Sequence, residues 1–290
     1  MKTRAFIYII IAGLLWGTSG LFVHVLSPYG FSSLQMSAMR GAVAALCMIV
    51  YALVKDRSLF CISKRELALF AASGVGIFGT ATSYYVAMQL TSVSTAVVLM
   101  YTAPVIVMVY SVLVFGEKMT TLKGVSVAAM LVGCCLVSGI IGGFKVNIPG
   151  ILMGLLSGIC YSAYNIFTKM QMRRNSKPMS ATLYCFTFMA IYAVLFSRPQ
   201  EAVQIVAQYP LKLLPYILGI GLVTCVLPYC LYTLAMKVLP AGTATSLGIV
   251  EPMAATVYSV VLLGEKLSVS SFCGIVLIIG AVFLLSRSKE

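Results

Sequence analysis

Charged side chains are scarce in this chain. Asp, Glu, Lys and Arg together make up 9% of its 290 residues, whereas a soluble domain typically carries about 25%. Hydrophobic residues make up 61%, and the mean hydropathy is +1.03. So little charge cannot cover a water-exposed surface of this size. The composition therefore excludes an ordinary soluble globular protein and predicts an integral membrane protein.

Residues that enzymes use for catalysis are also few. One aspartate, Asp56, and one histidine, His24, occur in the whole sequence, which excludes a paired-aspartate intramembrane protease. A serine protease stays open, although a single histidine supports it poorly. H-E-x-x-H, G-x-S-x-G and Walker motifs are missing, and none of the nine cysteines forms a C-x-x-C pair. We therefore expect no enzymatic activity, metal site, disulfide or cofactor.

Ten apolar runs have roughly the length that a helix needs to cross a bilayer, about 20 residues. The connections are short, so we expect no appended soluble domain. The first run is too long for a signal peptide and is expected to remain as an uncleaved helix. The sequence thus predicts an all-α membrane protein of ten transmembrane helices. The runs are 5–26, 34–54, 67–89, 95–115, 121–141, 148–168, 181–197, 212–235, 242–263 and 270–286.

The net charge of +13 indicates membrane orientation and not nucleic-acid binding. Lys and Arg lie in short segments between apolar runs and form no basic stripe. With the N-terminus inside, fifteen of these residues fall in cytoplasmic connections, four fall outside, and Arg40 lies within the second run. Because cytoplasmic loops are enriched in Lys and Arg, we predict a multi-pass protein of the cytoplasmic (inner) membrane with both termini cytoplasmic. The outside set is Lys145, Arg198, Lys212 and Lys266.

The two halves of the sequence are related. A shift of 148 residues lays 84–118 over 232–266 without a gap, and 14 of the 35 aligned residues are identical. An odd number of helices in each half puts the two copies in opposite membrane orientations. We therefore predict two inverted five-helix repeats, 1–141 and 148–290. Such repeats are typical of secondary transporters, whose substrate site lies at the repeat interface near the midplane.

The repeat preserves a proline in mid-helix, Pro104 in one half and Pro252 in the other. Because proline lacks an N–H and clashes with the carbonyl four residues back, it frees the carbonyls of Met100 and Gly248 at membrane depth. Lipid cannot satisfy these groups, whereas a watery cavity can. We predict two kinked helices that line a cavity; a packing kink without substrate contact is the alternative.

Two ionisable residues lie inside apolar runs, where a charge is costly and needs a reason. Glu251 is a candidate to bind a proton or the ammonium group of a substrate. Alternatively, it caps the helix segment that begins at Pro252. Its counterpart in the first half is Ala103. Arg40 is a candidate to hold a substrate carboxylate, with pairing to a neighbouring helix or snorkelling as the alternative.

Eight residues form the predicted substrate cavity. Tyr84 and Tyr232 are included because the repeat preserves them, although aromatic residues at helix ends are also typical of interfacial belts. His24 is expected at the membrane interface. The "GEK" segments at 116–118 and 264–266 are expected to end their helices with a left-handed glycine and to anchor the loops, with gating as the alternative. The cavity set is Glu251, Arg40, Tyr101, Met100, Gly248, Trp16, Tyr84 and Tyr232.

The sequence resembles the EamA-type ten-helix members of the drug/metabolite transporter superfamily over nearly its whole length. The resemblance rests on "LLWGTSGLFVHVL" at 14–26, Arg40, "YVAMQLTSVSTAVVLMYTAPV" at 85–105 and "SLGIVEPMAATVYSVVLLGEK" at 246–266. His24 departs from the lysine that many relatives carry. The resemblance implies an alternating-access exporter of small metabolites, with amino acids first, in which Glu251 is a candidate for proton coupling.

Two other functions stay open. A nucleotide-sugar or sugar-phosphate exchanger would need several cations facing the cavity, and Arg40 alone lies deep. A membrane receptor or accessory scaffold would be favoured by large cytoplasmic segments, and the longest polar gaps span only about a dozen residues. We expect a small-molecule substrate, the lipid bilayer and no nucleic acid as partners, and either a monomer or a homodimer.

The predicted orientation can be tested by cysteine labelling. Cysteines at positions 64 and 174 should face the cytoplasm, and those at 145 and 198 should face outside, because Lys and Arg are retained inside. The measurement uses a background without native cysteines, intact cells and an impermeant thiol reagent. Labelling of position 174 from outside would contradict the orientation.

Overall fold

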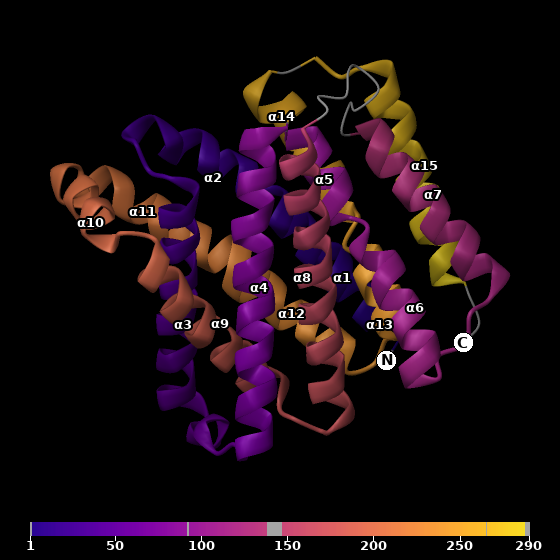
Figure 1. Cartoon of the computed structure of the whole chain (residues 1–290), viewed down its shortest axis with the longest axis horizontal. Helices are drawn as coiled ribbons and strands as arrows, with labels where there is room; N and C mark the ends of the chain where they lie inside the picture. The colour runs from indigo at the N-terminus through magenta and orange to yellow at the C-terminus, as the bar shows by residue number, and fades with distance from the viewer. Residues whose placement is uncertain (1, 92, 138–146, 265, 288–290) are drawn as a thin grey trace.

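The computed structural model describes residues 2–91, 93–137, 147–264 and 266–287, and its regular elements are helices (Figure 1). Within these ranges, nine helical spans have the length and hydropathy to cross a membrane. Thr121–Val137 (α7) is a tenth, shorter apolar helix of 17 residues. The remainder of the predicted run 121–141 lies outside the described residues. The all-α fold with ten membrane helices is confirmed.

The N-terminal half crosses the membrane five times, and two of its spans are broken. The turn η2 (Arg57–Phe60) connects the second span to the third. The five spans are α1 (Lys2–Gly17) with α2 (Ser19–Leu26) and η1 (Ser27–Tyr29); α3 (Ser33–Lys55); α4 (Lys64–Leu90); α5 (Val93–Met100) with α6 (Ala103–Phe115); and α7.

The C-terminal half has five corresponding spans and one additional surface helix, α10 (Pro199–Gln208). The spans are α8 (Ile148–Arg173); α9 (Pro178–Phe196); α11 (Pro210–Gly221) with the π-helical turn η4 (Leu222–Val226) and α12 (Leu227–Met236); α13 (Ala241–Leu247) with α14 (Val250–Leu263); and α15 (Val269–Ser286).

Three features differ from the predicted runs. The first run is interrupted at Thr18, whose hydroxyl donates to the Leu15 carbonyl (2.7 Å). The run at 212–235 widens into η4 just before Pro228, because proline cannot donate to the carbonyl four residues back. The predicted polar gap at 198–211 holds α10, whose polar residues hide a short amphipathic helix from a search for apolar runs.

Helix contacts are repeated when the two halves are exchanged. α4 packs along α8, and α12, in the counterpart of α4, packs along α1, the counterpart of α8. Likewise, α5 and α6 pack on α8, while α14 packs on α1. α7 packs on its own counterpart α15, and α3 on its counterpart α9. This pattern is what an approximate two-fold axis between inverted halves produces.

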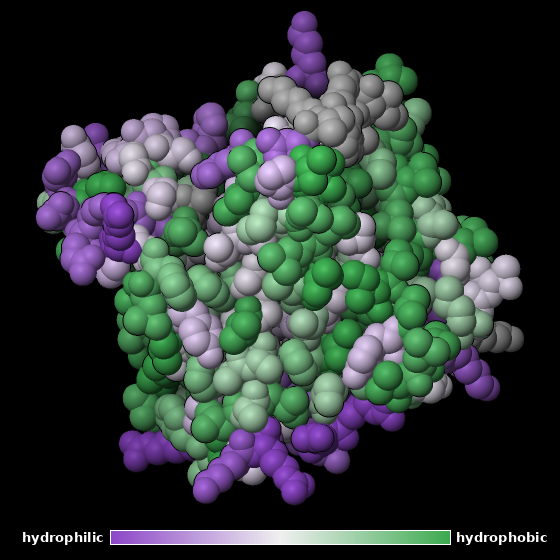
Figure 2. Space-filling view, viewed as in Figure 1, coloured by the Kyte–Doolittle hydropathy of each residue, from purple (hydrophilic) through white to green (hydrophobic). Residues whose placement is uncertain are grey.

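The flanks of the molecule are apolar. Figure 2 shows hydrophobic side chains over most of the visible flank, with hydrophilic ones along the lower edge and around α10. Leu113, Leu195 and Val261 are each more than 70% exposed, which suits side chains that face lipid. Lys64 and Arg174 are exposed at the lower edge, where α3 connects to α4 and α8 to α9 (Figure 1).

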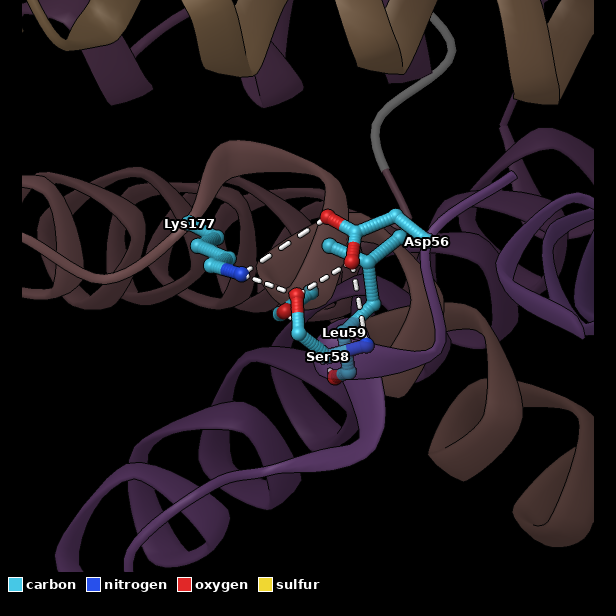
Figure 3. Close-up of polar contacts among 5 residues, drawn as sticks. Asp56, Ser58, Leu59 and Lys177 are labelled. Carbon is cyan, nitrogen blue, oxygen red and sulfur yellow. Dashed lines mark hydrogen bonds and ion pairs between the residues drawn. The ribbon is translucent and has the colours of Figure 1, made fainter.

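Polar contacts join two connections at this lower end. Asp56 accepts hydrogen bonds from the backbone N–H (3.0 Å) and the hydroxyl of Ser58. Lys177, just before α9, pairs with Asp56 (3.6 Å) and donates to Ser58 (Figure 3). The Ser58 hydroxyl, with smaller effects of its backbone N–H and of Lys177, lowers the pKa of the Asp56 carboxyl. The ionised Asp56 carboxylate therefore stabilises the folded protein near neutral pH, and this stabilisation is lost as the pH falls through the lowered pKa.

Lys123 and Lys169, which the charge count places on the cytoplasmic side, lie within helices with side chains that are buried or partly buried. Lys123 is 4% exposed in the first turn of α7 and donates to the carbonyl of Lys118 (3.2 Å). Lys169 lies on α8 and donates to the carbonyls of Met236 and Leu239. Lysines near helix ends can reach polar backbone groups because their stems are long and flexible.

The left-handed glycines expected at the two "GEK" segments are confirmed. Gly116 and Gly264 have φ angles of +67° and +71°, and each ends its helix. Glu117 continues from the first of these turns and accepts a hydrogen bond from the backbone N–H of Ala241 (3.0 Å), the first residue of α13. Glu265 lies outside the described residues.

Two glycines on α15 provide a test of the packing between α15 and α7. A Cβ on Gly274 would lie 2.7 Å from the Gly133 carbonyl oxygen and 2.8 Å from the Val137 nitrogen, whereas a Cβ on Gly280 would meet nothing within 4 Å. We expect Gly274→Ala to destabilise the protein by about 1–3 kcal/mol, because backbone atoms cannot give way. Gly280→Ala should be neutral or slightly stabilising. Thermal unfolding in detergent measures both, and equal effects would contradict the close contact.

Candidate functional site

The membrane helices break at three places around one cavity. The breaks are at Thr18 between α1 and α2, at Tyr101 and Thr102 between α5 and α6, and at Gly248 and Ile249 between α13 and α14. The cavity has a volume of about 380 Å³, and its wall is formed by α1, α2, α3, α4, α5, α8, α12 and α14. Among the residues on the wall, Gly20 is exposed and Met88 lies two residues before the end of α4. The cavity therefore extends toward the upper end of the molecule in Figure 1.

Two of the three breaks, those before α6 and α14, lie just before the repeated prolines Pro104 and Pro252. In the second half, the Gly248 carbonyl that Pro252 frees accepts hydrogen bonds from the Tyr101 hydroxyl (3.0 Å) and from the Glu251 N–H (2.9 Å). The Gly248 carbonyl therefore finds its hydrogen-bond donors within the protein, and Gly248 does not line the cavity, contrary to its expected place on the wall. Pro104 is also buried behind the wall, whereas Pro252 lies on it.

Glu251 faces the cavity from the first turn of α14. Its Oε2 accepts a hydrogen bond from the Tyr101 hydroxyl (2.9 Å). The helix N-terminus has no capping hydrogen bond from a side chain. The carboxylate thus lies where a helix dipole favours negative charge, but its hydrogen bond reaches across to the other half of the molecule.

Arg40 contributes a positive charge to the same cavity from α3. Its Nε is buried without a hydrogen-bond partner, and within the described residues no side chain forms an ion pair with it. The indole Nε1 of Trp16, also on the wall, is buried and unpartnered. Buried donors without partners are costly, and a buried unpaired charge more so. An anionic or carbonyl group of a bound molecule would satisfy both.

Aromatic rings form much of the remaining wall. Trp16 contacts Tyr229 edge-on (ring centroids 5.0 Å apart), and Tyr84 and Tyr161 line the cavity nearby. Tyr232 packs against Trp16 (5.4 Å) but does not reach the cavity. It is fully buried, and its hydroxyl donates to the side chain of Asn165. The repeat-related tyrosines therefore have different surroundings: Tyr84 faces the cavity and Tyr232 lies behind its wall.

The structure thus brings Glu251, Arg40, Tyr101, Met100, Trp16 and Tyr84 to one cavity and leaves Gly248 and Tyr232 behind it. Sequence reasoning did not select Tyr85, Tyr161 or Tyr229, which also line it. The repeat gave no signal for Tyr229, because the 148-residue shift pairs it with a different residue, Ala81. His24 is exposed in the last turn of α2, away from the wall.

A larger hollow of about 430 Å³ lies between α6 and α7 on the outer surface. Its lining consists of glycine and apolar side chains, such as Val109 and Leu131. A polar substrate would find no hydrogen-bond partner among these side chains, so this hollow does not compete with the polar cavity as a candidate site. Within the described residues, no cluster of His, Cys, Asp or Glu has the arrangement of a metal site.

Comparisons with known proteins give a consistent result. The sequence profile of the EamA-like transporter family matches residues 3–139 and again residues 148–287. The uncharacterized transporter YwfM of Bacillus subtilis is 25% identical over 98% of this chain and 94% of its own length. An uncharacterized transporter of Archaeoglobus fulgidus is 27% identical over 96% and 95%. The uncharacterized inner membrane transporter YicL of Salmonella typhimurium is 20% identical over 99% and 96%.

A solved crystal structure shares the fold. It superposes with a TM-score of 0.80, covering 98% of this chain and 96% of the other at 18% sequence identity. Identity this low supports the likeness of fold alone.

A double-mutant cycle tests the contact between Tyr101 and Glu251. We expect Tyr101→Phe and Glu251→Gln to show a coupling free energy of about 1–3 kcal/mol in unfolding, because a hydrogen bond to a buried carboxylate is stronger than a neutral one. Tyr84→Phe combined with Glu251→Gln is the control, because Tyr84 lines the same cavity and has no hydrogen bond to Glu251 in the described structure. Coupling of equal size in both cycles would contradict the contact.

Proposed function

Because the chain belongs to the EamA-like transporter family, we propose that it exports small zwitterionic metabolites, amino acids first, by alternating access. The single observation that carries the proposal is the pairing of charges in one cavity. An unpartnered Arg40 and a Glu251 held by Tyr101 face the same space within the membrane.

An amino acid matches these groups by chemistry. The guanidinium of Arg40 is suited to a carboxylate, which it can bind through two parallel hydrogen bonds. The carboxylate of Glu251 is suited to an ammonium group. The Trp16 indole N–H offers a further donor, and the rings of Tyr84 and Tyr161 offer an apolar surface for a side chain. The volume of about 380 Å³ is near the lower end of the range of about 300–1,000 Å³ for small-molecule pockets.

A nucleotide-sugar or sugar-phosphate exchanger ranks second. A phosphate group requires several positive charges, and on the wall of the cavity, as far as the structure describes it, Arg40 is the one cation. A receptor or accessory scaffold ranks third, because the connections between the described helices are short.

The proposed cycle follows from the repeats and the charge bias. We assign the two repeats to 1–141 and 148–290, and we assign both termini and the lower end of Figure 1 to the cytoplasm. In that orientation the cavity extends toward the outside, as in the state that releases an exported substrate. Proton coupling through Glu251 and a monomeric or homodimeric state belong to the same proposal.

Transport in proteoliposomes tests the proposed substrate class. A panel of radiolabelled amino acids and other metabolites should show counterflow of amino acids, and Arg40→Gln should reduce it by about tenfold or more, since a lost charged hydrogen bond costs about 1.5–3 kcal/mol. Arg40→Lys should retain part of the activity. Arg198→Gln is the control, because Arg198 is exposed and does not line the cavity.

Glu251→Gln distinguishes proton coupling from a capping role. If the carboxylate binds a proton or an ammonium group, transport by Glu251→Gln should fall or lose its pH dependence. Parental transport by Glu251→Gln from mildly acidic to mildly basic pH, with reduced expression of Glu251→Leu, would favour capping. Counterflow of sugar phosphates without amino acids would overturn the proposed substrate class.

A further inference from the structure

A third, much smaller hollow lies between α8, α9 and α12, toward the lower end of the molecule in Figure 1. Its volume is about 10 Å³, roughly that of one water-sized probe. Polar side chains line much of it, among them Thr168, Gln171, Thr182 and Thr233. We refer to this hollow and its lining as the polar seam.

One side chain separates the polar seam from the large cavity. Tyr229 lines both spaces. Its ring is held edge-on by Trp16 (5.0 Å), Tyr164 (5.7 Å) and Phe186 (5.1 Å). The cavity and the polar seam are thus neighbouring spaces, and this aromatic cluster lies between them.

The repeat relates the two spaces. The N-terminal helices on the wall of the cavity include α1, α3 and α4, and the polar seam is lined by α8, α9 and α12, which belong to the corresponding spans of the other half. At the level of residues, the 148-residue shift pairs Ala81 with Tyr229 and Tyr85 with Thr233. Ala81 and Tyr85 line the cavity, and their partners Tyr229 and Thr233 line the polar seam. The polar seam therefore occupies a position that the repeat relates to that of the open cavity.

The chemistry of the polar seam also fits a route for polar molecules. The Thr182 hydroxyl donates to the Thr233 hydroxyl across α9 and α12 (3.4 Å). Gln171 donates to the Ser73 hydroxyl and to the Leu69 carbonyl. Polar side chains within a membrane bundle face one another or a watery pathway, because lipid offers them no partner.

We propose that the polar seam opens to the lower end when the upper cavity closes, and that Tyr229 is the gate between them. The inference deepens the proposed alternating access and rests on it. In the alternative state, Thr168, Thr182 and Thr233 line the cavity through which a zwitterionic substrate enters from the lower side. As the cavity closes and the polar seam opens, the substrate moves past Tyr229 from one space to the other.

Native cysteines make the first test possible without substitutions. Cys185 lines the polar seam and is 5% exposed. Cys225 is fully buried and lines neither space. Cys61 is exposed in the connection before α4, at the lower end, and so reports which molecules present that end to the reagent.

The experiment treats sealed proteoliposomes with a charged, impermeant methanethiosulfonate reagent and reads each site by peptide mass spectrometry. We expect Cys185 to react about tenfold or more faster than Cys225, because thiol reactivity follows access to water. The labelled fraction of Cys185 should not exceed that of Cys61, because Cys61 marks the molecules whose lower end faces the reagent. In Tyr229→Ala the labelled fraction of Cys185 should rise above that of Cys61, because the reagent then also reaches Cys185 from the upper cavity. Equal protection of Cys185 and Cys225 over the whole time course would overturn the proposal.

A cross-link supplies the second test. In Thr182→Cys/Thr233→Cys the new thiols replace hydroxyls 3.4 Å apart, and a disulfide between them should hold the polar seam shut. Oxidation should then reduce Cys185 labelling by about tenfold or more, with recovery on reduction, while Thr233→Cys alone is unaffected. Undiminished labelling of Cys185 in the cross-linked protein would also overturn the proposal. Neither test uses a substrate, so its failure is distinct from a failure of the amino-acid assignment.

Discussion

A helix that breaks inside a bilayer leaves backbone carbonyls that only protein or trapped water can satisfy. At the break between α13 and α14, the Tyr101 hydroxyl meets this need by donating to the Gly248 carbonyl. The same hydroxyl lies 2.9 Å from Glu251. One phenol from the first half therefore stabilises the broken helix of the second half and positions its carboxylate. The position of Glu251 in the cavity therefore depends on how the broken helix satisfies its own backbone, and this requirement holds whether or not a substrate is bound.

The repeat provides the frame, and departures from it provide the chemistry. At the level of the breaks, Glu251 corresponds to Ala103, and Tyr101 corresponds to Ile249. A second carboxylate at the buried position 103 would add another charge at membrane depth, at high cost. With one carboxylate and one tyrosine, each from a different half, the pair is instead mutually satisfied. The cavity wall is accordingly unequal, which allows a substrate to be held in one orientation.

The sequence predicts correctly those features that a single physical effect determines. Ten apolar runs, the inverted halves and the left-handed ends at Gly116 and Gly264 follow from hydropathy, parity and backbone sterics. The prediction was wrong where two effects oppose each other. The break at Thr18 depends on a side-chain hydrogen bond to Leu15 within an uninterrupted apolar run, and α10 buries too little apolar surface to stand out.

The placement of the aromatic residues was the hardest part to predict. Tyr84 and Tyr232 are identical in the repeat, yet one faces the cavity and the other bonds to Asn165. An open cavity on one side and a collapsed one on the other give equivalent positions different surroundings. A sequence pattern describes the average of the two copies and cannot state which copy is open.

The contacts at the lower end suggest why such a state can be reversed. Charged side chains hold it: Glu117 accepts from the Ala241 N–H (3.0 Å), and Arg173 donates to the Phe115 carbonyl (3.2 Å). Hydrogen bonds to charged groups contribute about 1.5–3 kcal/mol each, and less where solvent screens them. The bond to Glu117 anchors α13, which consists of Ala, Gly, Thr and Ser before its final Leu247.

Small side chains allow α13 to approach α6 closely, as the near contact of Gly242 with the Met108 backbone shows. They also bury little apolar area that would have to be exposed again when this end opens. Polar contacts such as that of Glu117 with Ala241 then contribute to the free energy that separates the two states. Two or three hydrogen bonds to charged groups together contribute a free energy comparable to the roughly 5.5 kcal/mol of differential binding that reverses a two-state population from 1:99 to 99:1. A fold that closed this end with large apolar residues would need more than a small substrate can supply.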